Sequence, residues 1–115
     1  MAGTALLPWE EWLARLLHPL YVAVRRRLYK RQRRRDLHES EGWPEAKGEV
    51  HSKTWDSSLP REELLYSYST SQGYYSGTHW VWFERSEPHE VKVGDRIVVR
   101  YMPDDPQRSV FLRFG

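Results

Sequence analysis

The chain contains no cysteine among its 115 residues. Disulfide bridges, thiolate metal sites and cysteine nucleophiles are therefore excluded, and cysteine usage says nothing about the compartment. The five histidines include no pair at helical ligand spacing and no His-x-His, so we expect no metal site. The adjacent pairs Glu62-Glu63 and Asp104-Asp105 are typical of solvent charges and turns, and no serine lies in a nucleophile-elbow sequence. We therefore expect no catalytic residues, no cofactor and no enzymatic activity.

The chain also lacks a clean apolar run. Residues 5–24 have about the length of a membrane span but contain Glu10, Glu11 and Arg15. Because a charge near the centre of a span costs roughly 2.5–3.5 kcal/mol on the insertion scale, this segment is a poor spanning helix. The basic residues follow the apolar stretch instead of preceding it, which also argues against a signal peptide.

Charge is unevenly distributed along the chain. Residues 25–35 read RRRLYKRQRRR, with eight basic residues in eleven. Residues 1–35 carry nine Lys and Arg against two Glu, a net of +7, while residues 36–115 carry nine against fourteen acidic residues, a net of −5. Such a basic segment indicates attraction to an anionic surface, either lipid headgroups or nucleic acid.

The first 35 residues are predicted to form an imperfect amphipathic helix. At about 100° per residue, one broad arc collects the large apolar side chains. Pro19 is expected to kink this helix. The arc contains Trp9, Trp12, Leu13, Leu16, Leu17, Leu20, Tyr21, Val24 and Leu28.

Tryptophans near the start, leucines in the middle and arginines at the end fit a helix that lies in the headgroup region of an anionic membrane. Packing of the leucines on the β domain or on a second copy of the chain is the alternative. If the helix inserted, its trailing arginines would keep the rest of the chain cytoplasmic, so the cytoplasmic face is favoured. The expected membrane contacts are Trp9, Trp12, Leu13, Leu16, Leu20, Arg25, Arg26, Arg27, Lys30, Arg31, Arg33, Arg34 and Arg35.

The remaining chain indicates a small β domain at residues 47–115, joined by an acidic linker at 36–46 that contains Gly42 and Pro44. Gly73 and Gly77 are expected to bracket one turn, and residues 102–108 to form another. The predicted fold is mainly β, a small antiparallel barrel or sandwich of about five strands after an amphipathic, Pro-kinked helix. The expected strands are 48–55, 64–70, 78–84, 96–101 and 109–114.

Aromatic residues are concentrated between residues 66 and 83. Alternate rings could fill the core of a small domain that has few Leu and Ile residues. Exposed rings could instead stack on bases, with nearby arginines on phosphates. Trp80 and Trp82 share one strand face, so a strand here exposes some rings or has them covered by a partner. The candidate binding face consists of Tyr66, Tyr68, Tyr75, Trp80 and Trp82.

One set of motifs carries a family resemblance. In chain order these are Trp43 with Gly48-x-Val50, Tyr66-x-Tyr68, Tyr75-x-Gly77, Val93-Gly94-Asp95, and Val99-x-Tyr101-x-Pro103-x-x-Pro106-x-x-Ser109. Over residues 43–112 the chain resembles domain-of-unknown-function family 3592, which is bacterial. The resemblance implies membrane association and a β-rich domain but no activity or substrate. It also implies structural roles for Gly48, Gly77, Gly94, Asp95, Tyr101, Pro103, Pro106 and Ser109.

Two functions follow from these observations. The first is a non-enzymatic, membrane-associated β module that contacts another protein or an envelope component. The alternative is a nucleic-acid-binding protein that uses residues 25–35 and the aromatic residues of the β domain. The acidic net charge of residues 36–115 argues against the alternative, because an anionic domain repels phosphate.

Overall fold

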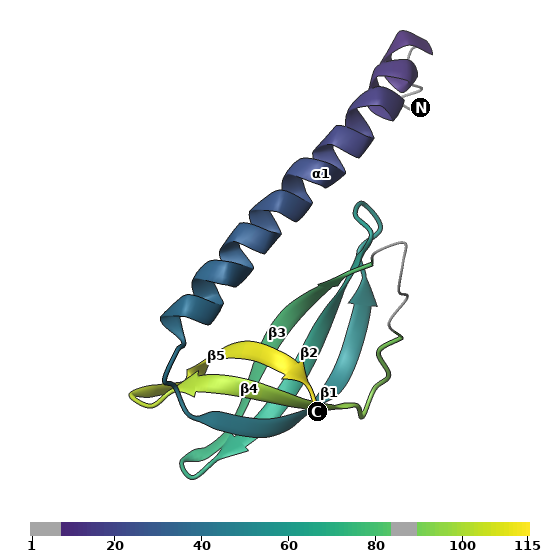
Figure 1. Cartoon of the computed structure of the whole chain (residues 1–115). Helices are drawn as coiled ribbons and strands as arrows, with labels where there is room; N and C mark the ends of the chain where they lie inside the picture. The colour runs from purple at the N-terminus through teal and green to yellow at the C-terminus, as the bar shows by residue number, and fades with distance from the viewer. Residues whose placement is uncertain (1–7, 84–89) are drawn as a thin grey trace. The chain divides into compact units, whose positions relative to one another are not determined.

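The computed structural model describes residues 8–83 and 90–115. One helix is followed by five strands (Figure 1). Residues 1–32 and 33–115 form two compact units, which are described separately. The elements are α1 (Pro8–Glu39), β1 (Glu45–Trp55), β2 (Arg61–Thr70), β3 (Gly73–Trp82), β4 (Arg96–Met102) and β5 (Asp105–Phe114).

The helix begins at Pro8, a residue well suited to a first helical turn because its missing N–H needs no partner there. It continues through Pro19 and ends at Glu39, four residues beyond the predicted boundary. In the residues that the structure describes, no helix is long and apolar enough to cross a membrane.

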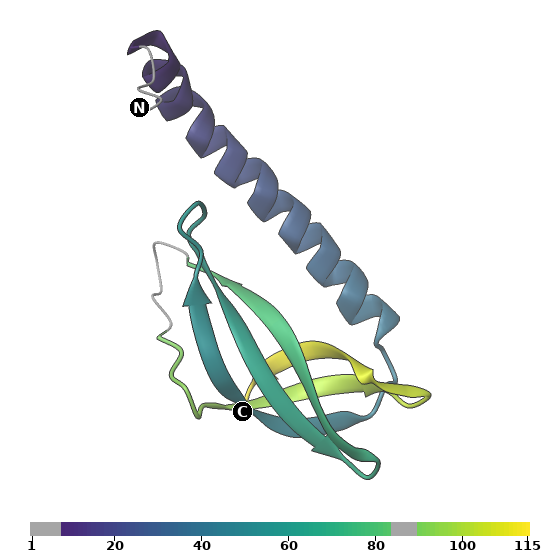
Figure 2. The same ribbon diagram turned by 180° about the vertical axis from the view of Figure 1, so that it is seen from behind.

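The five strands form one antiparallel sheet in the order β3-β2-β1-β4-β5. The sheet curls until its two edge strands, β3 and β5, contact each other, as the two opposite views show (Figures 1 and 2). The result is a nearly closed barrel, which confirms the predicted mainly β fold with an N-terminal helix. A bulge between Val50 and Ser52 interrupts the pairing of β1 with β2.

The barrel interior follows the alternation predicted for β2. Leu64, Tyr66 and Tyr68 point inward and are 0–2% exposed, whereas Leu65 and its alternate neighbours point outward. The other strands supply the remaining core residues in the same period-two pattern, except Val91, which lies in the segment before β4. The core consists of Ala46, Val50, Leu64, Tyr66, Tyr68, Val91, Ile97, Val99 and Phe111.

Two predicted turns were placed wrongly. Gly73 and Gly77 do not bracket a turn, because the chain reverses at residues 71–72 and both glycines lie within β3. The turn expected at 102–108 is only two residues long, Pro103 and Asp104, and β5 already begins at Asp105. The last residue of the strand predicted at 78–84 lies outside the described residues.

Candidate functional site

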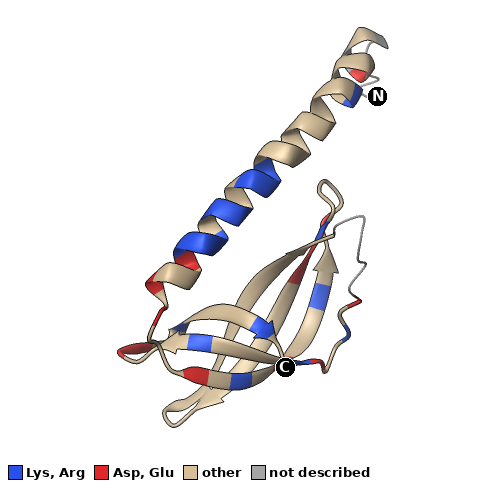
Figure 3. Ribbon diagram, viewed as in Figure 1, with Lys and Arg blue, Asp and Glu red and all other residues tan. Residues whose placement is uncertain are grey.

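The basic run of residues 25–35 lies entirely on α1 (Figure 3). Eleven residues make about three helical turns, so the eight cations point in all directions around the axis. The apolar arc of residues 9–24 occupies the preceding turns of the same helix. A single helix cannot bury its own apolar stripe, so α1 offers both features for contact with another surface.

Arg33 is an exception within the basic run, because it contacts the barrel. Its Nη2 atom donates a hydrogen bond of 3.2 Å to the Leu112 carbonyl oxygen. Its guanidinium lies 5.7 Å from the centre of the Phe111 ring. Arg33 was predicted to contact a membrane, which stays a prediction, and these contacts give it a structural role on β5.

Tyr66 and Tyr68 do not form an exposed binding face. They fill the barrel interior beneath the line where β3 meets β5, which we call the seam. The Tyr66 hydroxyl lies 2.7 Å from Ser109 Oγ, and the Tyr68 hydroxyl donates a hydrogen bond of 2.5 Å to the Pro106 carbonyl oxygen. Tyr75 is half-buried and stacks on Tyr68 at 5.9 Å between ring centres. Burial raises the pKa of both the Tyr66 and the Tyr68 phenol, which keeps them neutral.

His79 completes the seam from β3. Its imidazole stacks on Phe111 of β5, with 4.0 Å between ring centres and an angle of 10° between the planes. Burial, assisted by the positive charge of Arg33, lowers the pKa of His79 from 6.5 to about 3. The ring is therefore neutral near pH 7, and it acts as a flat aromatic side chain in the closure of the barrel.

Trp80 and Trp82 lie together on the outer face of β3, as predicted. Arg61 on β2 covers them, with its guanidinium 3.7 Å from the Trp80 ring centre and 5.4 Å from that of Trp82. Asp56 holds Arg61 in place through a 2.8 Å ion pair to Nε. Hydrogen bonds from Ser58, followed by that from Arg61, hold the Asp56 pKa well below its usual range. These tryptophans are thus covered by the chain's own arginine.

Among the motif residues, Gly77 and Ser109 lie at the seam, whereas Gly48 of β1 lies against β2. At Gly77, a Cβ atom would lie 2.5 Å from the Tyr66 hydroxyl oxygen and 2.8 Å from Ser109 Oγ. At Gly48, a Cβ atom would overlap the Ser67 carbonyl oxygen. At both positions a side chain would collide with neighbouring atoms, so glycine is the residue that fits. Pro106 is buried and supplies the carbonyl that Tyr68 binds.

The family model for a domain of unknown function (DUF3592) matches residues 39–115. The chain belongs to the DUF3592 family. No curated protein and no solved structure gives a significant match.

The DUF3592 motif between β3 and β4 closes one end of the barrel. Gly94 has a φ of 95°, a conformation that glycine adopts without strain. Its N–H donates to the Val50 carbonyl, and the Asp95 carbonyl accepts from the Val50 N–H. The Asp95 carboxylate accepts a hydrogen bond of 2.9 Å from the Lys92 N–H. The turn thus satisfies the backbone of β1 at its bulge.

Tyr101 and Pro103 belong to the opposite end of the DUF3592 barrel. The Tyr101 N–H donates to the Pro44 carbonyl, which joins β4 to the segment after α1, and its ring packs against the core. Pro103 begins the two-residue turn that leads into β5.

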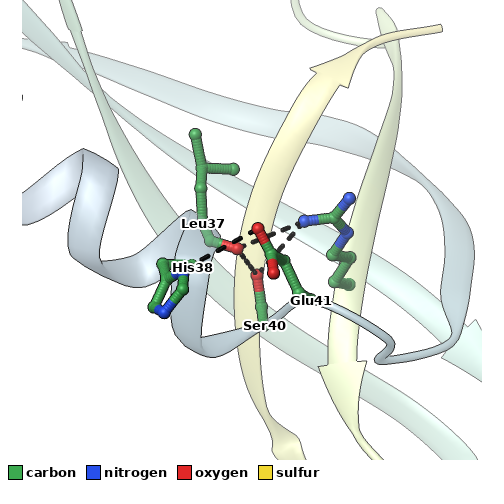
Figure 4. Close-up of polar contacts among 5 residues, drawn as sticks. Leu37, His38, Ser40 and Glu41 are labelled. Atoms are coloured by element: carbon green, nitrogen blue, oxygen red, sulfur yellow. Dashed lines mark hydrogen bonds and ion pairs between the residues drawn. The ribbon is translucent and has the colours of Figure 1, made fainter.

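The end of α1 is fixed to the same DUF3592 barrel (Figure 4). Ser40 is fully buried, and its hydroxyl donates to the Leu37 carbonyl oxygen at 3.2 Å. Arg100 on β4 places Nη1 3.4 Å from that carbonyl oxygen and 3.5 Å from Ser40 Oγ. The negative end of the helix dipole also favours a cation at this position. No sequence pattern predicts this contact, because Arg100 resembles any outward-facing strand residue.

In the described residues, no group of three or more His, Asp or Glu side chains could hold a metal ion. The polar side chains that the fold brings together are used in packing the seam, the Asp56–Arg61 pair and the end of α1. Two open grooves lie on the barrel surface, one lined by residues of β1, β2, β3 and β4 and the other by residues of β1, β2, β3 and β5, and Ser67 and Tyr74 line both.

Proposed function

We propose that this DUF3592 protein is a non-enzymatic β module that α1 attaches to an anionic membrane surface. The observation that carries the proposal is the juxtaposition on one helix of an apolar arc, residues 9–24, and a run of eight cations, residues 25–35. Stable attachment of a peripheral protein takes two signals, and an apolar face beside a basic segment supplies both.

Electrostatics supports attachment through the helix and not through the barrel. Each Lys or Arg near an anionic membrane contributes about 1 kcal/mol, and the attraction disappears within a Debye length. Residues 36–115 carry a net charge of −5, so an anionic surface repels them. Anionic lipids are concentrated in the cytoplasmic leaflet, which makes the cytoplasmic face of a membrane the proposed location.

The barrel is the part proposed to contact a protein partner. Its interior is filled by packed side chains, and its titratable groups with lowered or raised pKa values belong to structural contacts. We therefore assign it neither a catalytic reaction nor a cofactor.

Co-sedimentation of the full chain with vesicles tests the proposal. We expect binding to phosphatidylserine-containing vesicles at low salt, little binding to neutral phosphatidylcholine vesicles, and loss of binding at high salt. The triple variant R25Q/R31Q/R34Q removes three exposed cations and should weaken binding about 100-fold, at about 1 kcal/mol each. Trp9→Ala with Trp12→Ala should weaken it further by removing the interfacial rings.

A matched variant, K47Q/K92Q/R96Q, removes the same charge from exposed positions of the barrel and should bind as the wild type does. Equal weakening by both triple variants would indicate a nonspecific charge effect and contradict the proposal. Failure of the full chain to bind anionic vesicles at low salt would also contradict it. Preference for duplex DNA over these vesicles would instead assign residues 25–35 to nucleic-acid binding.

A further inference from the structure

The outer face of β2 and β3 is free of charge between Leu65 and Thr78, in contrast to the end of β2 that carries Arg61 and Glu63. The twenty residues from Leu64 to Phe83 contain no Asp, Glu, Lys or Arg, although 30% of the whole chain is charged. Alternate residues of the two strands point outward, and most of them carry a hydroxyl group. Apart from Trp80 and Trp82, which Arg61 covers, the outward residues of this stretch are Leu65, Ser67, Ser69, Tyr74, Ser76 and Thr78.

A shallow groove of about 540 Å³ opens on this face. Its polar groups are hydroxyls, an amide and an imidazole, nearly all of which can both donate and accept hydrogen bonds. Three strands and the bulge of β1 supply these side chains, so the groove is built on the rigid part of the barrel. It is lined by His51, Leu65, Ser67, Tyr74, Ser76 and Gln107.

Tyr74 is the central residue of this surface. It is 86% exposed, the most of any large apolar or aromatic side chain in the described residues. It also lines a second groove of about 450 Å³, together with Ser67 and Ser69, and this groove carries the charged residues Lys47, Glu49 and Arg96. The ring therefore stands between two adjacent grooves, each of a size that suits a small ligand.

We propose that the β2–β3 outer face around Tyr74 binds a neutral oligosaccharide. The C–H face of a pyranose can stack on the exposed ring, as apolar surfaces do on aromatic side chains. Sugar hydroxyls match the mixed donors and acceptors of Ser67, Ser76 and Gln107. Grooves on both sides of Tyr74 fit a chain of sugars that crosses the ring.

In the 540 Å³ groove, the absence of charged side chains favours a neutral sugar over a nucleic acid or a protein. A nucleic acid needs cations for its phosphates, and the 540 Å³ groove has no Lys or Arg among its lining residues. A protein surface usually brings charged side chains, which would lose water here without gaining a partner. All the residues of the proposed site belong to the β barrel, so the proposal does not depend on attachment of the helix to a membrane.

Titration of the ¹⁵N-labelled full chain with cellohexaose, maltohexaose and chitohexaose tests this inference by NMR. At least one of them should shift the amide signals of Ser67, Tyr74, Ser76 and Gln107. Tyr74→Ala should weaken binding about tenfold, which corresponds to the loss of one aromatic contact, whereas Tyr74→Phe should retain it. Tyr21→Ala, which removes a tyrosine from α1, is the matched control and should bind normally.

The proposal is overturned if none of the three sugars shifts these signals at millimolar concentration. It is also overturned if Tyr74→Ala binds as well as the wild type while its spectrum remains that of the folded protein. An oligothymidylate or a neutral Gly-Ser peptide that shifts the same amides more strongly than the sugars would assign the face to that class of ligand instead.

Discussion

At the scale of single residues, the barrel depends on a glycine where a larger residue has no room. A Cβ atom at Gly77 would meet the Tyr66 hydroxyl and Ser109 Oγ, which are bonded to each other. Because Tyr66 is 1% exposed, its ring cannot swing into solvent without opening the seam. We therefore expect Gly77→Ala to lower the free energy of unfolding by about 1–3 kcal/mol, the usual cost of overpacking a core. Urea denaturation followed by tryptophan fluorescence measures this change.

Tyr66→Phe is the informative companion to that substitution, because it removes the oxygen nearest to the added methyl group. The double variant should lose less stability than the two single variants together. Strict additivity, or an unchanged unfolding midpoint for Gly77→Ala, would mean that the seam has room for the added methyl group.

A second residue-scale prediction concerns acid stability. His79 has a pKa of about 3 in the folded protein against 6.5 for the free side chain. Below pH 6.5 the unfolded chain gains a proton that the folded protein does not, so stability falls from pH 6.5 to pH 3. The loss is on the order of 4 kcal/mol across this window. Unfolding free energies measured at half-unit pH intervals test this.

His79→Phe preserves a ring against Phe111 but does not titrate, so its stability should vary much less between pH 6.5 and pH 4. His38→Gln, at an exposed position, is the control and should leave the slope unchanged. A slope in His79→Phe equal to that of the wild type would locate the acid sensitivity elsewhere. The Asp56 carboxylate contributes only at lower pH, because its stabilising charge is lost below its ordinary pKa of 3.8.

At the scale of elements, local patterns predicted the existence of all five strands but not all of their ends. The alternation of Leu64, Tyr66 and Tyr68 is a local signal, and it correctly gave the inward face of β2. Gly77 was wrongly predicted to lie at a turn. It leaves space for the Tyr66 ring, and no local sequence pattern reveals that contact. Pro106 resembled a turn residue, but it lies on an edge strand, where its missing N–H interrupts no ladder.

The same limit applies to the candidate site. The concentration of aromatic residues was visible in the sequence, but which rings face inward depends on the register of β2 and β3. That register buries Tyr66 and Tyr68, and it leaves Tyr74 exposed. Tyr74, the centre of the proposed sugar site, was therefore not among the residues predicted from the sequence, although the charge-free stretch around it is visible there.

The attachment of the end of α1 gives an element-scale prediction. Arg100 faces the last carbonyls of the helix next to the buried Ser40, whereas Arg108 pairs with Glu39 in solvent, with 57% and 49% of their side chains exposed. Arg100→Met should therefore destabilise the folded chain by about 1 kcal/mol. Arg108→Met should cost less than about 0.5 kcal/mol, as expected for an exposed ion pair. Urea midpoints of the two variants provide the comparison, and the reverse order would refute it.

At the scale of the whole molecule, the charge separation along the sequence does not coincide with the division into structural units. The basic run ends at Arg35, but the β unit already begins at Arg33. Charge counting could not detect this, because Arg33 and Arg34 are indistinguishable in a basic run. Only the contacts of Arg33 with Leu112 and Phe111 separate the two.

These neighbouring arginines should therefore behave differently. Arg33→Gln removes a hydrogen bond to a carbonyl of β5 and should lower the unfolding free energy by about 1–2 kcal/mol. Arg34 is exposed, so Arg34→Gln should leave stability within about 0.5 kcal/mol. Under the proposed membrane attachment, Arg34→Gln should weaken binding to anionic vesicles about fivefold, the effect of one surface cation, and Arg33→Gln should weaken it less. Measuring the unfolding free energy and the vesicle binding of each variant tests the two roles separately. Equal effects on stability would contradict the structural role of Arg33, while equal effects on binding would mean that Arg33 leaves the barrel at the membrane.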